Sequence, residues 1–296
     1  MVEDFAISKN IHNLANICYD YKELIKLNIK LREGRTRMDF KHLLYSQVNS
    51  IGIVQLNRPD SFNAFNMEMF HELNELLDEI IKDDSILAVV IKGNAKFFGA
   101  GADLREVINY DSLEVRHYIE KAHNMGYKFL KMKKPTIASI SGFCLGGGCE
   151  LAICCDFRIA DETAVFGLPE INLGIFPAGG GTQRLARIVG NAKARELILT
   201  GDIIDSKEAL AIGLITKLVS PAELEEATMK LARKLSRKPP LAVEMVKELL
   251  DISQHIDPTT GTYMEREKFS VLFSSEDKDE GMKAFLEQRR PVFKGR

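Results

Sequence analysis

The apolar residues of the chain change their spacing several times, from strand-like runs to helix-like stripes. Leu43–Val48 and Ile51–Leu56 have the pattern of two strands, and Asn49–Ser50 between them favours a hairpin turn. Asn66 then precedes a stretch whose apolar residues lie three and four positions apart. Because asparagine is a good helix N-cap, an amphipathic helix is predicted to begin after Asn66.

Two later runs, Ile86–Ile91 and Pro135–Ile140, are apolar almost throughout. Such runs are typical of strands that are buried on both faces of a sheet. A helix is predicted between them, because Asp111 and Glu114 have the spacing of a capping box. Strands and helices therefore alternate along the chain, which indicates an α/β fold.

The remainder of the chain is predicted to be mostly helical. Short strands are expected at residues 157–160, 164–167 and 214–219. Helices are expected at residues 191–199, 206–212, 221–236, 240–250, 258–272 and 277–290.

Three loops of small residues interrupt this pattern, at residues 97–103, 141–150 and 177–182. The middle loop contains three consecutive glycines, Gly146–Gly148, and leads into an apolar, helix-like segment. Glycine lets a backbone approach a ligand closely, and a helix start directs free N–H groups toward it. The loop therefore suits an anion or oxyanion site, although an isolated glycine triplet is more often a turn needed only for tight packing.

Two glutamates, Glu150 and Glu170, stand close to these loops in the sequence. Ligands of α/β folds bind beyond the carboxyl ends of strands, where two acids can divide the work of base and acid. Either glutamate alone is more often an acid that only complements a helix dipole. The loops lack the glycine spacing of dinucleotide-binding and P-loop motifs, and the chain has no Gly-x-Ser-x-Gly elbow.

Composition narrows the class of protein. With 296 residues, of which 45% are hydrophobic, the chain can form one large domain or a domain with an appendage. A net charge of -2 gives no electrostatic reason to expect nucleic acid or an anionic membrane as the main partner. No apolar run is long enough for a membrane span and no secretory signal pattern is present, so a cytoplasmic location is expected.

The five cysteines lack zinc-site spacing and have no histidine near the cluster of four at residues 144–155. We expect no metal site, and we expect the cysteines to act as small buried side chains in a reducing compartment.

Residues 1–37 differ from the rest of the chain. Their apolar residues recur at helical spacing, and acidic residues argue against a transit peptide. A docking helix, a disordered arm and a stretch upstream of a start at Met38 are the alternatives, and the last two are favoured.

Several motifs, taken in order, resemble those of the crotonase superfamily and within it the enoyl-CoA hydratases. They are Leu56–Pro59, Asn63–Asn66, Phe98–Asp103, Ser141–Ala152, Phe166–Gly174 and Pro177–Leu185. The resemblance covers about residues 38–296.

This resemblance implies a fold, an assembly and a substrate. Residues 38–230 would form a spiral of ββα units, and residues 231–296 a helical region used in trimer formation. A homotrimer, or a homohexamer of two trimers, is implied. The implied activity is hydration of a trans-2-enoyl-CoA in fatty acid β-oxidation, with CoA carried by the substrate and no separate cofactor.

The resemblance also implies roles for individual residues. The N–H groups of Ala100 and Gly147 would form an oxyanion hole for the thioester carbonyl. Glu150 would activate water, and Glu170 would deliver a proton to the α-carbon. The backbone run expected to meet the adenine part of CoA consists of Ala100, Gly101, Ala102 and Asp103.

Other interpretations stay open at this point. Isomerases of the superfamily tend to keep the equivalent of Glu170 alone, and a non-catalytic protein that binds acyl-CoA or RNA is a second alternative.

Leu104–His123 corresponds to the segment that lines the acyl pocket. Asp60 stands where many members have a lysine near CoA, so another cationic side chain would have to make that contact with CoA. The candidates are Arg58, Lys278, Arg290 and Lys294.

Overall fold

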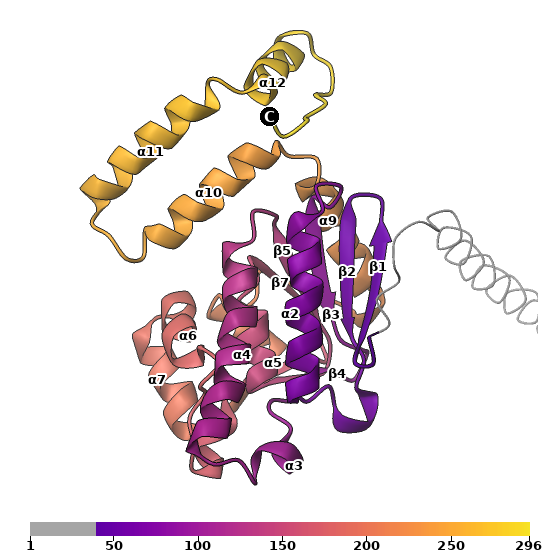
Figure 1. Cartoon of the computed structure of the whole chain (residues 1–296), viewed down its shortest axis with the longest axis vertical. Helices are drawn as coiled ribbons and strands as arrows, with labels where there is room; N and C mark the ends of the chain where they lie inside the picture. Colours follow the sequence, from indigo (N-terminus) through magenta and orange to yellow (C-terminus); the bar gives the residue numbers. More distant parts are fainter. Residues whose placement is uncertain (1–39) are drawn as a thin grey trace, which may run out of the picture. The chain divides into compact units, whose positions relative to one another are not determined.

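The computed structural model describes residues 40–296. The predictions for residues 1–37 and for a start at Met38 lie outside the described residues. The described part of the chain forms one compact unit, in which two sheets and their helices surround a common core (Figure 1).

The larger sheet has six strands in the order β1-β2-β3-β5-β7-β10. These strands are β1 (Leu43–Val48), β2 (Ile51–Leu56), β3 (Ala88–Lys92), β5 (Thr136–Ile140), β7 (Phe157–Asp161) and β10 (Lys217–Val219). The hairpin β1–β2 is antiparallel, and every other pair in this sheet is parallel. The predicted hairpin is therefore confirmed.

The smaller sheet has four strands in the order β4-β6-β8-β9. They are β4 (Phe97–Gly99), β6 (Phe143–Leu145), β8 (Val165–Gly167) and β9 (Ile203–Asp205). The chain thus visits the large sheet and then the small sheet three times, as β3–β4, β5–β6 and β7–β8, with helices after each visit. This is the repeated ββα spiral that the resemblance implied.

The helices follow the strands in chain order. The α-helices are α2 (Met67–Lys82), α3 (Leu104–Val107), α4 (Ser112–Lys131), α5 (Gly147–Ala152), α6 (Gly181–Val189), α7 (Asn191–Thr200), α8 (Ser206–Ala211), α9 (Leu224–Leu235), α10 (Pro240–Ile252), α11 (Pro258–Leu272) and α12 (Glu276–Leu286). The short 3₁₀ segments are η1 (Pro59–Ser61), η2 (Pro169–Leu173) and η3 (Pro221–Glu223).

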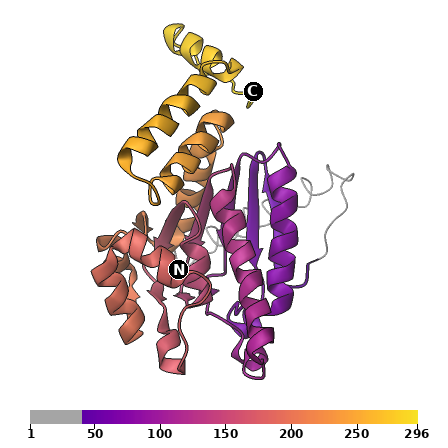
Figure 2. The same cartoon turned by 60° about the vertical axis from the view of Figure 1, so that its left-hand side comes forward.

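Alternate residues of the central strands feed two hydrophobic clusters. Along β3, Val89 and Ile91 belong to the larger cluster, which includes the inner faces of α2 and α4. Ala88 and Val90 belong to the smaller cluster, which includes Ala232 of α9. The continuous apolar runs of the sequence are explained, because both faces of these strands are covered. Figures 1 and 2 show α2 and α4 side by side over the sheet.

Both predicted helix starts are confirmed. The Met69 N–H donates to Asn66 Oδ1 over 2.9 Å at the start of α2. At the start of α4, Asp111 and Glu114 form a complete capping box, in which each side chain accepts a hydrogen bond from the other residue's backbone N–H.

Several predicted boundaries are wrong. The expected strand at residues 214–219 is reduced to β10, because Leu214 and Ile215 are buried in the core without pairing to a neighbour. The last helix ends at Leu286 instead of residue 290, and Gln288 has a φ of 55°. β4, β6 and β9 were not predicted; β4 and β6 lie within the segments interpreted as loops of small residues, 97–103 and 141–150.

Helices α10 and α11 form an antiparallel pair (Figure 1). None of their side chains is buried. Lys247 on α10 ties the pair to the core, since its Nζ lies 2.5 Å from Asp156 Oδ2 and donates to Lys134 O over 3.0 Å. The boundary predicted between residues 230 and 231 falls inside α9, whose Ala232 packs on the large sheet.

The four cysteines at residues 144–155 are buried and unpaired, as expected. Between residues 40 and 296, no helix combines the length and apolar character that a membrane crossing requires. In the same part of the chain, no three His, Cys, Asp or Glu side chains gather as a metal-binding group.

Candidate active site

The glycine turn Gly146–Gly148 forms the start of α5. Gly146 has a φ of 50° and occupies the N-cap position. A Cβ on Gly148 would lie 2.1 Å from Gly99 O at the end of β4. Only glycine permits this close approach of two backbones. The turn is thus pressed against the loop that follows β4.

The second loop, residues 100–103, touches the same turn. A Cβ on Gly146 would lie 3.2 Å from Gly101 Cα. Gly101 and Gly146 are buried, whereas Ala100 and Gly147 are half-buried and keep access to solvent. The two residues predicted to supply oxyanion donors therefore lie on adjoining backbone segments, and neither is fully buried.

Glu150 is buried, with 7% of its surface exposed. Its Oε1 accepts a hydrogen bond of 2.7 Å from the Gly181 N–H at the start of α6. Burial raises the pKa of Glu150 to about 7, and the charge of Glu170 adds to the rise. The Gly181 N–H and the charge of Arg184 oppose it. This carboxyl therefore changes its protonation near neutral pH.

Glu170 lies on η2 and is half-buried. Its Oε1 is 2.9 Å from the position that a Cβ on Gly146 would occupy, so the carboxylate packs directly against the glycine turn. Its Oε2 is buried and has no hydrogen-bond partner among residues 40–296. Burial raises the pKa of Glu170. A buried polar atom without a partner is unusual in proteins and indicates a place for a ligand or water.

The structure thus brings together four separate segments: the loop after β4, the glycine turn, η2 and the loop before α6. Their neighbourhood holds two backbone segments with accessible N–H groups and two carboxyl groups whose pKa values are raised. Such an arrangement can polarise a carbonyl oxygen and move protons beside it.

Comparison with known proteins agrees with this geometry. The family model for enoyl-CoA hydratase/isomerase matches residues 46–296. The short-chain-enoyl-CoA hydratase of Clostridium acetobutylicum is 38% identical over 254 residues, which are 86% of this chain and 97% of that protein. The chain belongs to the enoyl-CoA hydratase/isomerase family.

Two further members show the same relationship. The 2,3-dehydroadipyl-CoA hydratase of Escherichia coli is 41% identical over 255 residues, which are 86% of this chain and 99% of that protein. The crystal structure of an enoyl-CoA hydratase from Bacillus anthracis is 35% identical and has a TM-score of 0.84, with 86% of this chain and all of that chain covered. The crotonase fold expected from the motifs is therefore confirmed.

Two side chains that were not predicted from the sequence hold the loop before α6 in place. Arg184 Nη1 donates to Gly179 O over 2.8 Å, and His123 Nε2 lies 2.7 Å from Ala178 O. The loop carries the Gly181 N–H that binds Glu150. Arg184 lies inside the motif Pro177–Leu185, but nothing in the sequence indicates where its guanidinium points.

The four cations considered for the CoA phosphates differ in their availability. Arg58 is taken up by Asp103, with Nη2 2.8 Å from Oδ2 and both side chains 14% exposed. Lys278 is paired with Asp279, and Lys294 Nζ lies 3.9 Å from Glu276 Oε2. In the described part of the chain, Arg290 is the candidate for which no ion pair is recorded.

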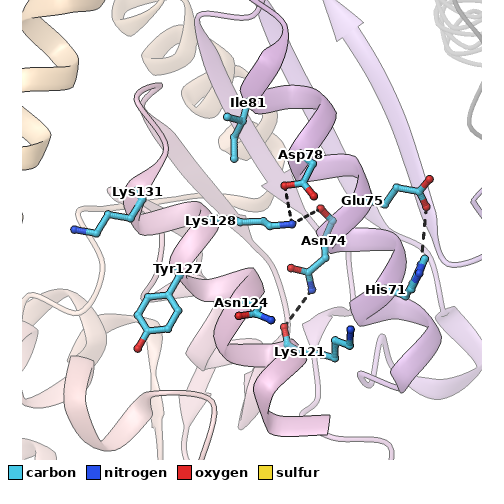
Figure 3. Close-up of a pocket in the computed structure, with 10 residues that line it drawn as sticks. All are labelled: His71, Asn74, Glu75, Asp78, Ile81, Lys121, Asn124, Tyr127, Lys128 and Lys131. Atoms are coloured by element: carbon cyan, nitrogen blue, oxygen red, sulfur yellow. Dashed lines mark hydrogen bonds and ion pairs between the residues drawn. The ribbon is translucent and has the colours of Figure 1, made fainter. Parts of the chain in front are cut away.

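A separate groove of about 740 Å³ lies between α2 and α4 (Figure 3). Lys128 spans it, with Nζ 2.7 Å from Asp78 Oδ1 and 2.8 Å from Asn74 O. Tyr127 and Lys131 border it on α4. Neither glutamate, nor any residue predicted for the oxyanion hole or the CoA contact, lines this groove. Lys121, which does line it, belongs to the segment Leu104–His123 that the resemblance assigned to the acyl pocket.

Proposed function

We propose that this protein is an enoyl-CoA hydratase, which adds water reversibly to a trans-2-enoyl-CoA and produces a 3-hydroxyacyl-CoA. The observation that carries the proposal is that two carboxyl groups meet at one site: Glu170 packs against Gly146, and Glu150 packs against Gly179 and Gly181 and feels the charge of Glu170. The names of the two hydratase relatives support the same reaction for this chain.

The proposed oxyanion hole consists of the N–H groups of Ala100 and Gly147. Both would donate to the thioester oxygen, which gains negative charge as the enolate forms. Donors already in place for this charge stabilise the transition state more than the substrate, so they raise kcat. Loss of one such donor costs about a hundredfold in rate or more.

The proposed proton transfers divide between the two glutamates. Glu150 takes a proton from water while the water oxygen forms a bond to the β-carbon, and the electron pair of the double bond moves onto the thioester as an enolate. Glu170 then delivers a proton to the α-carbon, so that H and OH have been added. The unpartnered Oε2 of Glu170 supports its contact with water or substrate.

No separate cofactor takes part in this proposal, because CoA arrives as part of the substrate. The proposed CoA contact is the backbone run of Ala100, Gly101, Ala102 and Asp103. The acid Asp103 is neutralised there by Arg58, which supports a structural rather than a phosphate-binding role for that arginine.

We also propose that the protein assembles as a homotrimer, or as a hexamer of two trimers, through its C-terminal helices. Exposed apolar side chains on these helices support the proposal. They include Leu250 at 63%, Phe269 at 59%, Phe285 at 83% and Leu286 at 80% exposure. Surfaces of this kind are typical of contacts between subunits. The cytoplasmic location stays a prediction.

The test is hydration of crotonyl-CoA and of longer and ω-carboxylated enoyl-CoAs. The reaction is monitored by the loss of absorbance of the conjugated enoyl thioester. Absence of turnover on every chain length would refute the proposal. The variant Glu150→Gln distinguishes an isomerase, because double-bond migration on a 3-enoyl-CoA at the wild-type rate would assign the site to that reaction.

A further inference from the structure

Phe65 lies between the two backbone segments that carry the proposed oxyanion donors. Its side chain is buried, with 1% exposed. Ring atom Cε2 is 3.2 Å from the position that a Cβ on Gly99 would occupy, and Cδ2 is 3.5 Å from the corresponding position on Gly147. One ring therefore packs against both the end of β4, just before Ala100, and the first residue of α5.

The backbone of Phe65 holds the same loop from the other side. Its N–H donates to Gly101 O over 2.8 Å, and its carbonyl accepts from the Asp103 N–H over 2.7 Å. These bonds form a parallel bridge between Phe65 and Ala102. Ala100 is thus followed directly by a segment that is hydrogen-bonded to Phe65, and its position depends on that residue.

Two further aromatic residues hold Phe65 itself. Its ring stacks on Phe70 of α2, with centroids 5.3 Å apart, and Phe70 meets Tyr118 of α4 edge-on at 5.1 Å. The Tyr118 hydroxyl donates to Phe65 O over 2.9 Å. Burial raises the pKa of Tyr118, so the hydroxyl stays a neutral donor. Phe65 is therefore fixed at its ring and at its carbonyl.

We propose that Phe65 is a positioning residue that sets the spacing between the Ala100 and Gly147 N–H groups, and that the Tyr118 hydroxyl fixes Phe65 for this task. The inference rests on the proposed function, since the spacing matters only if a thioester oxygen binds between the two donors. A displacement of about 1 Å in such a site costs about a hundredfold in rate.

The test compares Phe65→Leu with Phe129→Leu. Leucine at position 65 keeps an apolar side chain of branched shape but lacks the ring atom that contacts the Gly99 loop. Phe129 is a fully buried residue of α4 in the same core and controls for a general loss of packing. Tyr118→Phe, which removes one hydroxyl, is matched by Tyr127→Phe on the exposed side of α4.

Two readouts are measured. The first is kcat and KM for hydration of crotonyl-CoA. The second is the infrared carbonyl stretch of bound butyryl-CoA labelled with ¹³C at the thioester carbon, which has no double bond to hydrate. Hydrogen bonds from the two donors lower this stretch, so it reports their alignment independently of turnover.

We expect Phe65→Leu to lower kcat by about thirtyfold or more, with KM changed less than about threefold, and to return the carbonyl stretch toward its value in water. Tyr118→Phe should have a smaller effect in the same direction. Both control variants should keep the wild-type stretch and a kcat within about threefold of wild type.

A folded Phe65→Leu protein with the wild-type stretch would overturn the inference, and so would equal effects of Phe65→Leu and Phe129→Leu. If Phe65→Leu does not fold, Tyr118→Phe decides, and an unchanged stretch and kcat in that variant would refute the role. A wild-type protein that lowers the stretch but hydrates no enoyl-CoA refutes the proposed reaction, while the infrared comparison still tests Phe65. A wild-type protein that leaves the stretch unchanged refutes the oxyanion hole and this inference together.

Discussion

The surroundings of Glu150 and of Glu170 differ although the two carboxyl groups belong to one site. Glu150 is buried, and a backbone N–H from Gly181 holds one of its oxygens. Glu170 is half-buried, and its buried Oε2 has no partner in the described part of the chain. The protein thus fixes one carboxyl by its own backbone and leaves the other with capacity for a ligand. Two acids of the same type can take different roles for this reason.

The largest expected effect comes from removing the two carboxylates one at a time. Glu150→Gln and Glu170→Gln should each lower kcat for hydration by about a thousandfold, because general acid–base catalysis contributes about this much. KM should change little, since neither group holds CoA in the proposed mechanism. Because the two acids act on one reaction, the fold decrease in kcat of the double variant should be much smaller than the product of the two single fold decreases. Steady-state kinetics on crotonyl-CoA measure all three, and multiplicative losses would contradict a joint role.

The second prediction concerns stability. The pKa of Glu150 is raised to about 7 in the folded protein, so between its unfolded value and pH 7 the folded state binds more protons than the unfolded state. Stability therefore falls as pH rises through this window, by about 3 kcal/mol in total. Glu150→Gln keeps an oxygen that accepts the Gly181 N–H but carries no charge. The variant therefore avoids the loss of stability that ionisation of Glu150 causes.

Denaturant unfolding checks the stability prediction. The midpoint of Glu150→Gln should exceed that of wild type at pH 8, and the difference should vanish at pH 4. Glu170→Gln should show a smaller gain, because its carboxyl is less buried. Equal midpoints of Glu150→Gln and wild type at pH 8 would show that Glu150 is not a buried charged group.

The third prediction uses a glycine that lies against the Glu150 carboxyl. A Cβ on Gly179 would lie 2.4 Å from Glu150 Oε2, at a position without positive φ, so Gly179→Ala should displace that carboxyl and lower kcat by about tenfold. Gly261→Ala on α11 is the matched control, because its Cβ would meet nothing closer than 3.7 Å. Wild-type kcat in a folded Gly179→Ala protein would mean that the position of Glu150 is not critical.

The smallest expected effect is a shift in pH dependence. Since Glu150 must be ionised to accept a proton, kcat/KM for hydration should fall below about pH 7. The positive charge of Arg184 lowers the pKa of Glu150, so Arg184→Gln should move this acid limb to higher pH, while Arg184→Lys should leave it nearly in place. Identical profiles for Gln and Lys would exclude an electrostatic effect of Arg184 on Glu150.

Much of the architecture follows from local patterns. The hairpin, the capped helices α2 and α4, and the buried strands β3 and β5 were predictable because spacing, caps and apolar runs act over a few residues. The three-residue strands β4 and β6 were not, because a strand of this length exists only when a neighbouring strand pairs with it.

The candidate site divides in the same way. The residue types at Ala100, Gly147, Glu150 and Glu170 are present in the chain and, through their motifs, pointed to the family and its chemistry. Their placement at one site depends on contacts between separate segments, such as Gly99 with Gly148 and Glu150 with Gly181. Only the tertiary structure decided that the Gly181 N–H binds Glu150, that Asp103 pairs with Arg58, and that the Phe65 ring packs against both loops. The physical reason is that hydrogen bonding, burial and close packing between distant segments leave no periodic trace in the sequence.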